Sequence, residues 1–283
     1  MVTLTRPDGT EPQDLHLTRR GAVASMFFAG YALAAVAADA KPVTTPEDGL
    51  TIDEVLIANG AEKPLPAYVA RPKGNGRYPC VIVVNEIFGV HAYIKDTCRR
   101  LAKLGYVAIA PEFFYRSGVN LPALTDFNEI RKVVAQAGND QVDGDVRAVS
   151  GWLKAQKFAR GDRIGITGFC WGGAVVWRAA MVDPDIKAGV AWYGQLKPLI
   201  ARAGELKAPV LGLYGGLDRG IPLTDVEAMR AALKAAGKTG SDIHVYPQAQ
   251  HGFHADYRPS YSEADARDGW ARLLAHFKAH GVA

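Results

Sequence analysis

Gly168-Phe169-Cys170-Trp171-Gly172-Gly173 is the stretch that decides the fold. Residues 163–167 before it have strand character, and residues 171–181 after it have helix character. A G-x-C-x-G sequence between a strand and a helix predicts a sharp turn that lifts its central residue above the sheet, because the two glycines let strand and helix approach closely. We therefore expect Cys170 to be a nucleophile whose thiolate is favoured by the helix N-terminus.

The competing interpretation of Cys170 is a buried, inert cysteine beside a glycine-rich helix contact, since lone buried cysteines are common. The other cysteines fit that description better, because Cys80 falls in an expected core strand and Cys98 in an expected helix. In the turn, the amide of Trp171 directly follows the nucleophile. We expect this amide to donate a hydrogen bond to an oxyanion.

The chain on either side of this turn alternates between strand and helix signals. Apolar runs bounded by glycine or proline predict strands, and apolar residues three or four apart predict helices. The expected strands cover residues 51–58, 67–71, 80–84, 106–110, 163–167, 186–193, 210–214 and 243–246, and the expected helices cover residues 91–104, 139–156, 171–181, 223–236 and 261–280. This order predicts an α/β fold with a mostly parallel central sheet and helices on both faces, in one domain over residues 41–283. The first two strands are expected to form an antiparallel pair at the sheet edge.

The composition excludes several other classes of protein. The 283 residues are 48% hydrophobic and 22% charged, which is typical of a globular chain and not of a disordered one. A net charge of +4 without any long run of Lys and Arg argues against a nucleic-acid partner. Three cysteines are too few, and odd in number, for a disulfide framework.

The first forty residues differ from the rest of the chain. Arg19-Arg20 precede an uncharged, alanine-rich run over residues 21–38, and Ala35-Val36-Ala37 and Ala38-Asp39-Ala40 have the A-x-A spacing of a cleavage site. This pattern predicts a removable signal segment over residues 1–40 that is recognised by the twin-arginine export machinery. The mature protein would then be periplasmic, without a stable membrane span. The alternative is an alanine-rich helix packed on the domain of a cytoplasmic protein.

A cysteine nucleophile needs a base and a group that orients the base. In folds with such a turn, an acid and then a histidine follow the nucleophile in the chain, each on a loop after a later strand. Asp218 comes after the expected strand 210–214, and His251 comes after the expected strand 243–246. His254 competes with His251 for the role of base, and the two histidines also have the spacing of a metal pair. No further ligands cluster with them, so we expect neither a metal nor a cofactor.

These motifs resemble those of the dienelactone hydrolase family, the cysteine branch of the α/β-hydrolase fold. The resemblance extends from about residue 50 to the C-terminus and rests on Asn85-Glu86-Ile87-Phe88-Gly89-Val90, the Cys170 turn, Tyr214-Gly215-Gly216-Leu217-Asp218 and His251-Gly252-Phe253. It implies a catalytic triad of Cys170, His251 and Asp218 that hydrolyses the cyclic enol-lactone formed during chlorocatechol degradation. It also implies that Glu86 keeps the resting cysteine as a neutral thiol, and that the amide of Ile87 is the second oxyanion donor beside that of Trp171.

The resemblance also points to substrate-binding residues. Pro111-Glu112-Phe113-Phe114-Tyr115-Arg116 matches the family segment whose arginine binds a substrate carboxylate, so Arg116 is a candidate anchor. The second arginine of the family, four residues after the histidine, is replaced here by Ala255, and the nearest arginine is Arg258. Tyr193, at the end of the expected strand 186–193, is a candidate to line the pocket, although a packed tyrosine is equally consistent with the sequence.

From these observations we expect a hydrolase that cleaves a lactone or a small carboxylic ester through an acyl-enzyme on Cys170. Its partner is a small-molecule substrate, and the departure at Ala255 leaves open whether that substrate carries a carboxylate. One alternative is a thiol esterase that acts on an unrelated small ester. The other is a non-catalytic, redox-responsive protein in which Cys170 is a sensor thiol.

Overall fold

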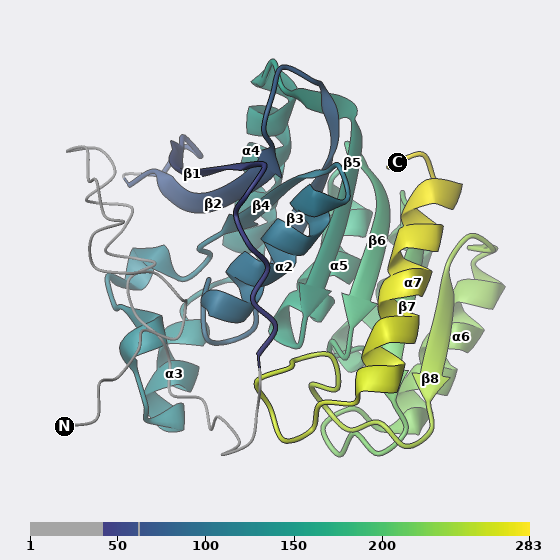
Figure 1. Ribbon diagram of the computed structural model, residues 1–283. Coiled ribbons are helices and arrows are strands. Elements are labelled where there is room, and N and C mark those ends of the chain that lie inside the picture. The colour runs from purple at the N-terminus through teal and green to yellow at the C-terminus, as the bar shows by residue number, and fades with distance from the viewer. Residues whose placement is uncertain (1–41, 62) are drawn as a thin grey trace.

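The described residues form one sheet of eight strands in the order β1-β2-β4-β3-β5-β6-β7-β8 (Figure 1). The computed structural model describes residues 42–61 and 63–283, so the signal-like segment with Arg19-Arg20 lies outside the described residues. The strands are β1 (Leu50–Ile57), β2 (Leu65–Pro72), β3 (Tyr78–Val84), β4 (Val107–Pro111), β5 (Ala159–Phe169), β6 (Ile186–Trp192), β7 (Val210–Gly215) and β8 (Asp242–Tyr246). β1 and β2 form the predicted antiparallel pair at the edge, and β2 is also antiparallel to β4. From β4 to β8 all neighbours are parallel, which confirms the predicted fold class.

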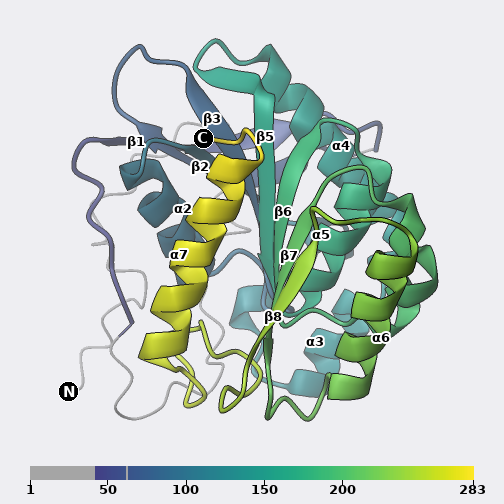
Figure 2. The same ribbon diagram turned by 90° about the vertical axis from the view of Figure 1, so that its right-hand side faces the viewer.

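Helices cover both faces of the sheet, as predicted. The α-helices are α2 (Ala92–Lys103), α3 (Phe127–Val134), α4 (Asn139–Ala155), α5 (Trp171–Val182), α6 (Leu223–Ala235) and α7 (Glu263–Ala279). Figure 2 shows α2 and α7 on one side of the sheet and α4, α5 and α6 on the other. In the described part of the chain, no helix is both long and apolar enough to cross a membrane.

The segment between β4 and α4 contains elements that the sequence did not predict. It forms the short 3₁₀ turns η2 (Tyr115–Ser117) and η3 (Leu121–Ala123) and then α3, and a further 3₁₀ stretch, η4 (Lys197–Glu205), precedes β7. Asp126 caps α3 by accepting a hydrogen bond from the amide of Asn128. An eight-residue helix offers too few turns for a periodic pattern, so this segment reads as a loop in the sequence.

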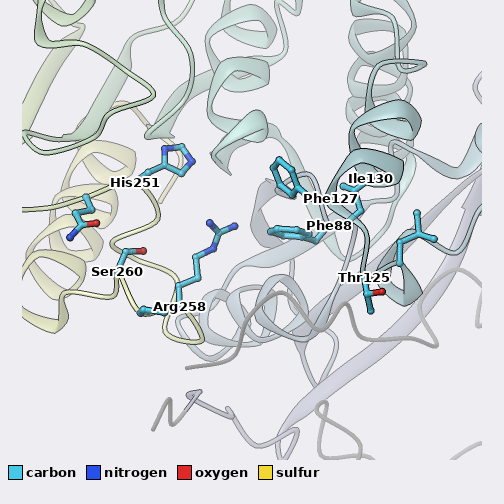
Figure 3. Close-up of a pocket in the computed structure, with 10 residues that line it drawn as sticks. Phe88, Thr125, Phe127, Ile130, His251, Arg258 and Ser260 are labelled. Carbon is cyan, nitrogen blue, oxygen red and sulfur yellow. The ribbon is translucent and has the colours of Figure 1, made fainter. Parts of the chain in front are cut away.

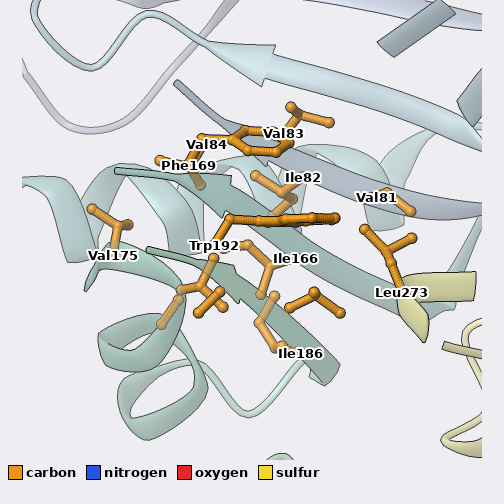
Figure 4. Close-up of a cluster of buried hydrophobic side chains, with 14 of the residues drawn as sticks. Val81, Ile82, Val83, Val84, Ile166, Phe169, Val175, Ile186, Trp192 and Leu273 are labelled. Atoms are coloured by element: carbon orange, nitrogen blue, oxygen red, sulfur yellow. The ribbon is translucent and has the colours of Figure 1, made fainter. Parts of the chain in front are cut away.

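The core lies on both faces of the central strands. Val81, Ile82, Val83 and Val84 of β3 are fully buried, as expected for a parallel strand that is covered by helices on both faces (Figure 4). The rings of Phe169 and Trp192, at the ends of the neighbouring strands β5 and β6, stack with their centroids 5.6 Å apart. These large buried side chains hold the carboxyl ends of the central strands together.

The parallel strands place the predicted chemical residues at a single edge of the sheet. Cys170 follows β5 directly, Glu86 follows β3, Asp218 follows β7, and His251 lies in the loop after β8. In open α/β sheets, the crevice beyond the carboxyl ends of the strands is the usual position of a ligand site. The topology therefore brings together residues that are far apart in the sequence.

Candidate active site

The turn at Cys170 has the strained geometry that the glycine spacing predicts. Cys170 adopts φ 56° and ψ −116°, a backbone conformation that residues with a side chain rarely take. A Cβ on Gly168 would lie 2.5 Å from the carbonyl oxygen of Gly172, and a Cβ on Gly172 would lie 2.6 Å from the carbonyl oxygens of Val84 and Asn85. Only glycine at both positions lets β5, α5 and β3 approach this closely.

His251 connects Asp218 with Cys170. Its Nδ1 lies 2.7 Å from Oδ2 of Asp218, and the side chain of Asp218 is completely buried. The amide of Gly220 donates to the other carboxylate oxygen of Asp218 at 2.8 Å, which fixes the orientation of the carboxylate. Burial alone would lower the pKa of His251, but its hydrogen bonds to Asp218 and to Cys170 outweigh burial and raise the pKa to about 10. The site therefore favours an imidazolium beside the sulfur.

His254 has a different environment and lies apart from Asp218. Its Nδ1 is 2.5 Å from the hydroxyl of Tyr93, and its ring stacks on Phe169 and Trp270 at centroid distances of 5.2 and 5.7 Å. Burial lowers the pKa of His254 to about 3, so the ring is neutral and part of the core. Of the two histidines, only His251 is in a position to act as a base toward Cys170. Within the residues that the structure describes, no three His, Cys, Asp or Glu side chains come together as a metal site.

Two backbone amides beside Cys170 have no acceptor within the described part of the chain. The amides of Ile87 and Trp171 are not donors in any of the backbone hydrogen bonds there. Ile87 lies in the turn that follows β3, and Trp171 is the first residue of α5. An oxyanion hole requires two such donors that face the reacting carbonyl.

Glu112 stabilises the turn that carries Ile87, a role that sequence reasoning missed. Its buried carboxylate accepts hydrogen bonds from the amides of Val90 (2.8 Å) and Phe114 (3.4 Å). Gly89 adopts φ +73°, and a Cβ there would lie 2.7 Å from Oε2 of Glu112. Burial raises the pKa of Glu112 to about 7 although both amides oppose the shift. Glu112 is part of the sequence motif that ends at Arg116. Its role becomes visible only in the structure, through the hydrogen bond from the amide of Val90, 22 residues away.

Glu86 has partners other than the predicted one. Its fully buried carboxylate accepts hydrogen bonds from the hydroxyl of Tyr257 (2.5 Å) and from Nη2 of Arg258 (2.9 Å), and Nε2 of His91 lies 3.5 Å away. Burial would raise the pKa of Glu86, but Arg258, His91 and Tyr257 outweigh it and lower the pKa to about 2. The contacts of this carboxylate within the described residues are to Tyr257, Arg258 and His91, and none is to Cys170, so the implied effect of Glu86 on the thiol stays a prediction.

A cavity of about 670 Å³ opens beside His251 (Figure 3). Its apolar wall is formed by Phe88, Leu124, Phe127, Ile130 and Pro259. Its polar wall is formed by Thr125, Gln250, His251, Arg258 and Ser260. The segment from η3 to α3 thus supplies four of the ten residues that line the cavity. A volume of this size accommodates a small organic ligand.

The structure does not bring Arg116 to this cavity. Its guanidinium forms a two-point ion pair with the buried carboxylate of Asp145 on α4, at 2.5 and 2.7 Å. The same carboxylate also accepts from the side chain of Asn59. This geometry argues against the predicted anchor role, because the guanidinium already has its carboxylate partner and links α4 to the segment after β4.

Tyr193 lies next to His251 and has no exposed surface. Its ring centroid is 5.1 Å from that of His251 and 5.3 Å from that of Phe253. Its backbone has a positive φ of 39°. Of the two uses that the sequence allowed for Tyr193, the geometry favours a packed tyrosine that supports the histidine over one that lines the cavity.

A cysteine at a strained strand-to-helix turn, with an acid and a histidine on later loops of a mostly parallel sheet, defines an α/β-hydrolase. The model of the Dienelactone hydrolase family matches residues 65–281 of the chain. The chain therefore belongs to the dienelactone hydrolase family.

Several known proteins are similar to the chain over most of its length. It is 47% identical over 278 residues to "Putative carboxymethylenebutenolidase" of Methylorubrum extorquens, with 94% of each chain covered. It is 32% identical over 241 residues to "Probable 2-oxo-3-(5-oxofuran-2-ylidene)propanoate lactonase" of Bradyrhizobium sp, with 82% of this chain and 95% of that protein covered. The crystal structure of "Putative Dienelactone Hydrolase" from Klebsiella pneumoniae superposes with a TM-score of 0.76 at 46% identity, over 81% of this chain and 98% of the other. The chain is thus a hydrolase of the dienelactone hydrolase type.

Proposed function

We propose that the protein hydrolyses a lactone or a small carboxylic ester through an acyl-enzyme on Cys170. The observation that carries the proposal is the position of His251, whose Nδ1 hydrogen-bonds Asp218 and whose pKa is raised by its interaction with Cys170. A nucleophile, a base and an orienting carboxylate in this order are what acyl transfer requires. The printed names of the relatives, a carboxymethylenebutenolidase and a lactonase, support the same reaction class.

In the first half of the proposed reaction, the thiolate of Cys170 attacks the carbonyl carbon of the substrate. The carbonyl oxygen becomes an oxyanion that the amides of Ile87 and Trp171 stabilise. The acyl carbon–oxygen bond then breaks, which leaves a thioester on Cys170. The alcohol or enol oxygen departs with a proton from the His251 imidazolium.

In the second half, water attacks the thioester while neutral His251 accepts a proton from it. The carboxylic acid departs and the thiolate of Cys170 leaves as the sulfur–carbon bond breaks, which restores the imidazolium and thiolate pair. Asp218 holds the imidazole so that its other nitrogen faces the sulfur in both halves. The substrate, one water molecule and the side chains of the chain are sufficient to balance these steps.

Turnover of p-nitrophenyl acetate separates this hydrolase from a sensor thiol. We expect the enzyme to release many equivalents of p-nitrophenol, and iodoacetamide to abolish the release in proportion to the alkylation of Cys170. The measurement follows absorbance and quantifies alkylation by mass spectrometry. A protein that is alkylated at Cys170 but never turns over the ester would instead support the redox-responsive alternative.

We further propose that the protein is exported to the periplasm by the twin-arginine machinery. Arg19-Arg20, the uncharged run after them and the A-x-A spacing support this proposal from the sequence. The mature protein is expected to start near Ala38 or Lys41. Changing both arginines to lysine should leave the precursor in the cytoplasm, as measured by fractionation and N-terminal sequencing. A native protein that keeps residue 1 or 2 at its N-terminus would contradict the proposal.

A further inference from the structure

The peptide unit that joins Glu86 to Ile87 contains one of the two expected oxyanion donors. Its N–H, on Ile87, is not a donor in any backbone hydrogen bond of the described residues, whereas its C=O, on Glu86, accepts two hydrogen bonds. A trans peptide unit is planar, so its N–H points in the direction opposite to its C=O. The groups that fix the carbonyl of Glu86 therefore also fix the direction of the Ile87 amide.

The side chain of Asn85 is the nearer of the two donors to this carbonyl. Nδ2 of Asn85 lies 2.6 Å from the carbonyl oxygen of Glu86, and the amide nitrogen of Gly89 lies 3.3 Å from the same oxygen. Asn85 has no exposed surface, so bulk water does not compete for the bond. Asn85 thus holds the peptide unit at the end opposite to the Ile87 N–H.

This hydrogen bond is the one that the Asn85 side chain makes within the described part of the chain. Its other polar atom, Oδ1, is buried and has no hydrogen-bond partner among the described residues. A substitution of Asn85 therefore removes the bond to the Glu86 carbonyl and leaves no previously paired group except that carbonyl without its partner. This makes position 85 a clean place to test what the bond does.

The turn that contains Ile87 lies directly against the turn at Cys170, because β3 and β5 are neighbouring parallel strands. A Cβ on Gly172 would lie 2.6 Å from the carbonyl oxygen of Asn85, so the first turn of α5 packs closely on this segment. Phe88, the residue after Ile87, lines the cavity beside His251. Ile87 is thus placed between the nucleophile and the space for a substrate.

The far end of the same turn is held by Glu112. Its buried carboxylate accepts a hydrogen bond from the amide of Val90 at 2.8 Å. The turn is therefore fixed after Ile87 by Glu112 and before it by Asn85. Of these two contacts, only that of Asn85 acts on the peptide unit that contains the oxyanion donor.

We propose that Asn85 is a positioning residue that directs the amide of Ile87 toward the oxyanion of the reaction. The proposal rests on the hydrolase function proposed above and assigns Asn85 no contact with the substrate. Because Asn85 acts through the Glu86–Ile87 peptide unit, its effect is confined to steps in which a carbonyl oxygen gains negative charge. The reactivity of the Cys170 thiolate itself does not depend on it.

Two reactions of the same thiol separate these effects. p-Nitrophenyl acetate acylates Cys170 through an oxyanion, whereas iodoacetamide alkylates it by displacement of iodide, as a sulfur–carbon bond forms without an oxyanion. In Asn85→Ala, we expect kcat/KM for the ester to fall by about ten- to a hundredfold and the alkylation rate constant of Cys170 to stay within about twofold. An unchanged kcat/KM would overturn the proposal, and so would an equal loss in both reactions.

Asn59→Ala is the matched control. The side chain of Asn59 also donates hydrogen bonds, to the hydroxyl of Tyr115 and to the carboxylate of Asp145, and it is not in the lining of the cavity. Both rate constants of this variant should stay within about twofold of the wild type. Asn85→Ser, in which the side chain is too short to reach the same carbonyl, provides a second test if Asn85→Ala does not fold, and it should show the same separation of the two reactions.

A thionoester gives a readout that a merely structural role would not change. O-p-Nitrophenyl thionoacetate replaces the carbonyl oxygen with sulfur, which is a weaker hydrogen-bond acceptor. Relative to the same two esters reacting with 2-mercaptoethanol, the wild-type enzyme should favour the oxygen ester by about tenfold or more, and Asn85→Ala should reduce this preference at least about threefold. Equal preferences in the two proteins would overturn the assignment.

The same assays distinguish this proposal from the hydrolase function on which it rests. If the wild-type enzyme turns over neither ester, the hydrolase proposal itself fails. If the wild type turns over p-nitrophenyl acetate and Asn85→Ala is equally fast, only the role of Asn85 fails.

Discussion

Replacement of Cys170 by alanine is expected to lower kcat/KM for p-nitrophenyl acetate by about 10⁴-fold or more, the usual loss for a nucleophile. The fold should persist, because the side chain of Cys170 is only partly buried and alanine tolerates the same backbone conformation no worse than cysteine does. Circular dichroism and the urea midpoint verify the fold, and steady-state kinetics measure the loss.

Cys98→Ala is the matched control for this variant. Cys98 is a fully buried cysteine of α2, and burial raises its pKa, so it is an inert thiol. This control should lose some stability through the missing sulfur but keep the activity of the folded enzyme. Retention of a tenth of the wild-type activity by Cys170→Ala would mean that the nucleophile lies elsewhere.

Asp218→Asn is expected to lower kcat/KM by about 10³- to 10⁴-fold with little change in shape. The asparagine amide can donate to Nδ1 of His251, which stabilises the tautomer that cannot serve Cys170. In the wild-type protein, the hydrogen bond that Nδ1 of His251 donates to Asp218 is also the first of the contacts that raise the pKa of His251 to about 10 against the opposing effect of burial.

The pH profile of this variant provides a second readout. The imidazolium is lost as the pH rises through its pKa, so wild-type activity should decline near pH 10, and Asp218→Asn should move this decline to lower pH. Asp162→Asn is a control, since Asp162 is exposed at the opposite end of β5. An unchanged rate and an unchanged alkaline limit in Asp218→Asn would exclude Asp218 as the orienting group.

The sequence predicts those parts of the fold whose signals are local. Each strand of the parallel sheet is a short apolar run in the sequence. Because parallel strands all end at the same edge of the sheet, the residues that follow them lie at that edge. For this reason Cys170, Asp218 and His251 could be assigned to one site without a structure. The local pattern predicts that β5 starts at residue 163, whereas the strand begins at Ala159. Its first residues pair with Tyr78 and Pro79 before a bulge, and no local pattern in the sequence indicates this pairing.

The sequence does not predict contacts that depend on how distant segments meet. Glu86 and Arg258 are 172 residues apart, and their ion pair exists only because the loop after β8 folds back over the turn after β3. Arg116 matched a motif, but its carboxylate partner Asp145 is on α4, which the motif does not include. These ion pairs between distant segments determine that Arg258, and not Arg116, faces the cavity. The sequence alone does not predict which arginine does so.

Capture of the acyl-enzyme is the measurement that tests the central claim most directly. The enzyme is mixed with excess p-nitrophenyl acetate, quenched with acid before the slow step is complete, digested and mapped by mass spectrometry. The account predicts one acetyl group per chain, attached to the peptide that contains Cys170, which disappears when the ester is exhausted and is absent from Cys170→Ala. A stable or transient acetyl group on another residue, or full turnover by Cys170→Ala, would contradict it.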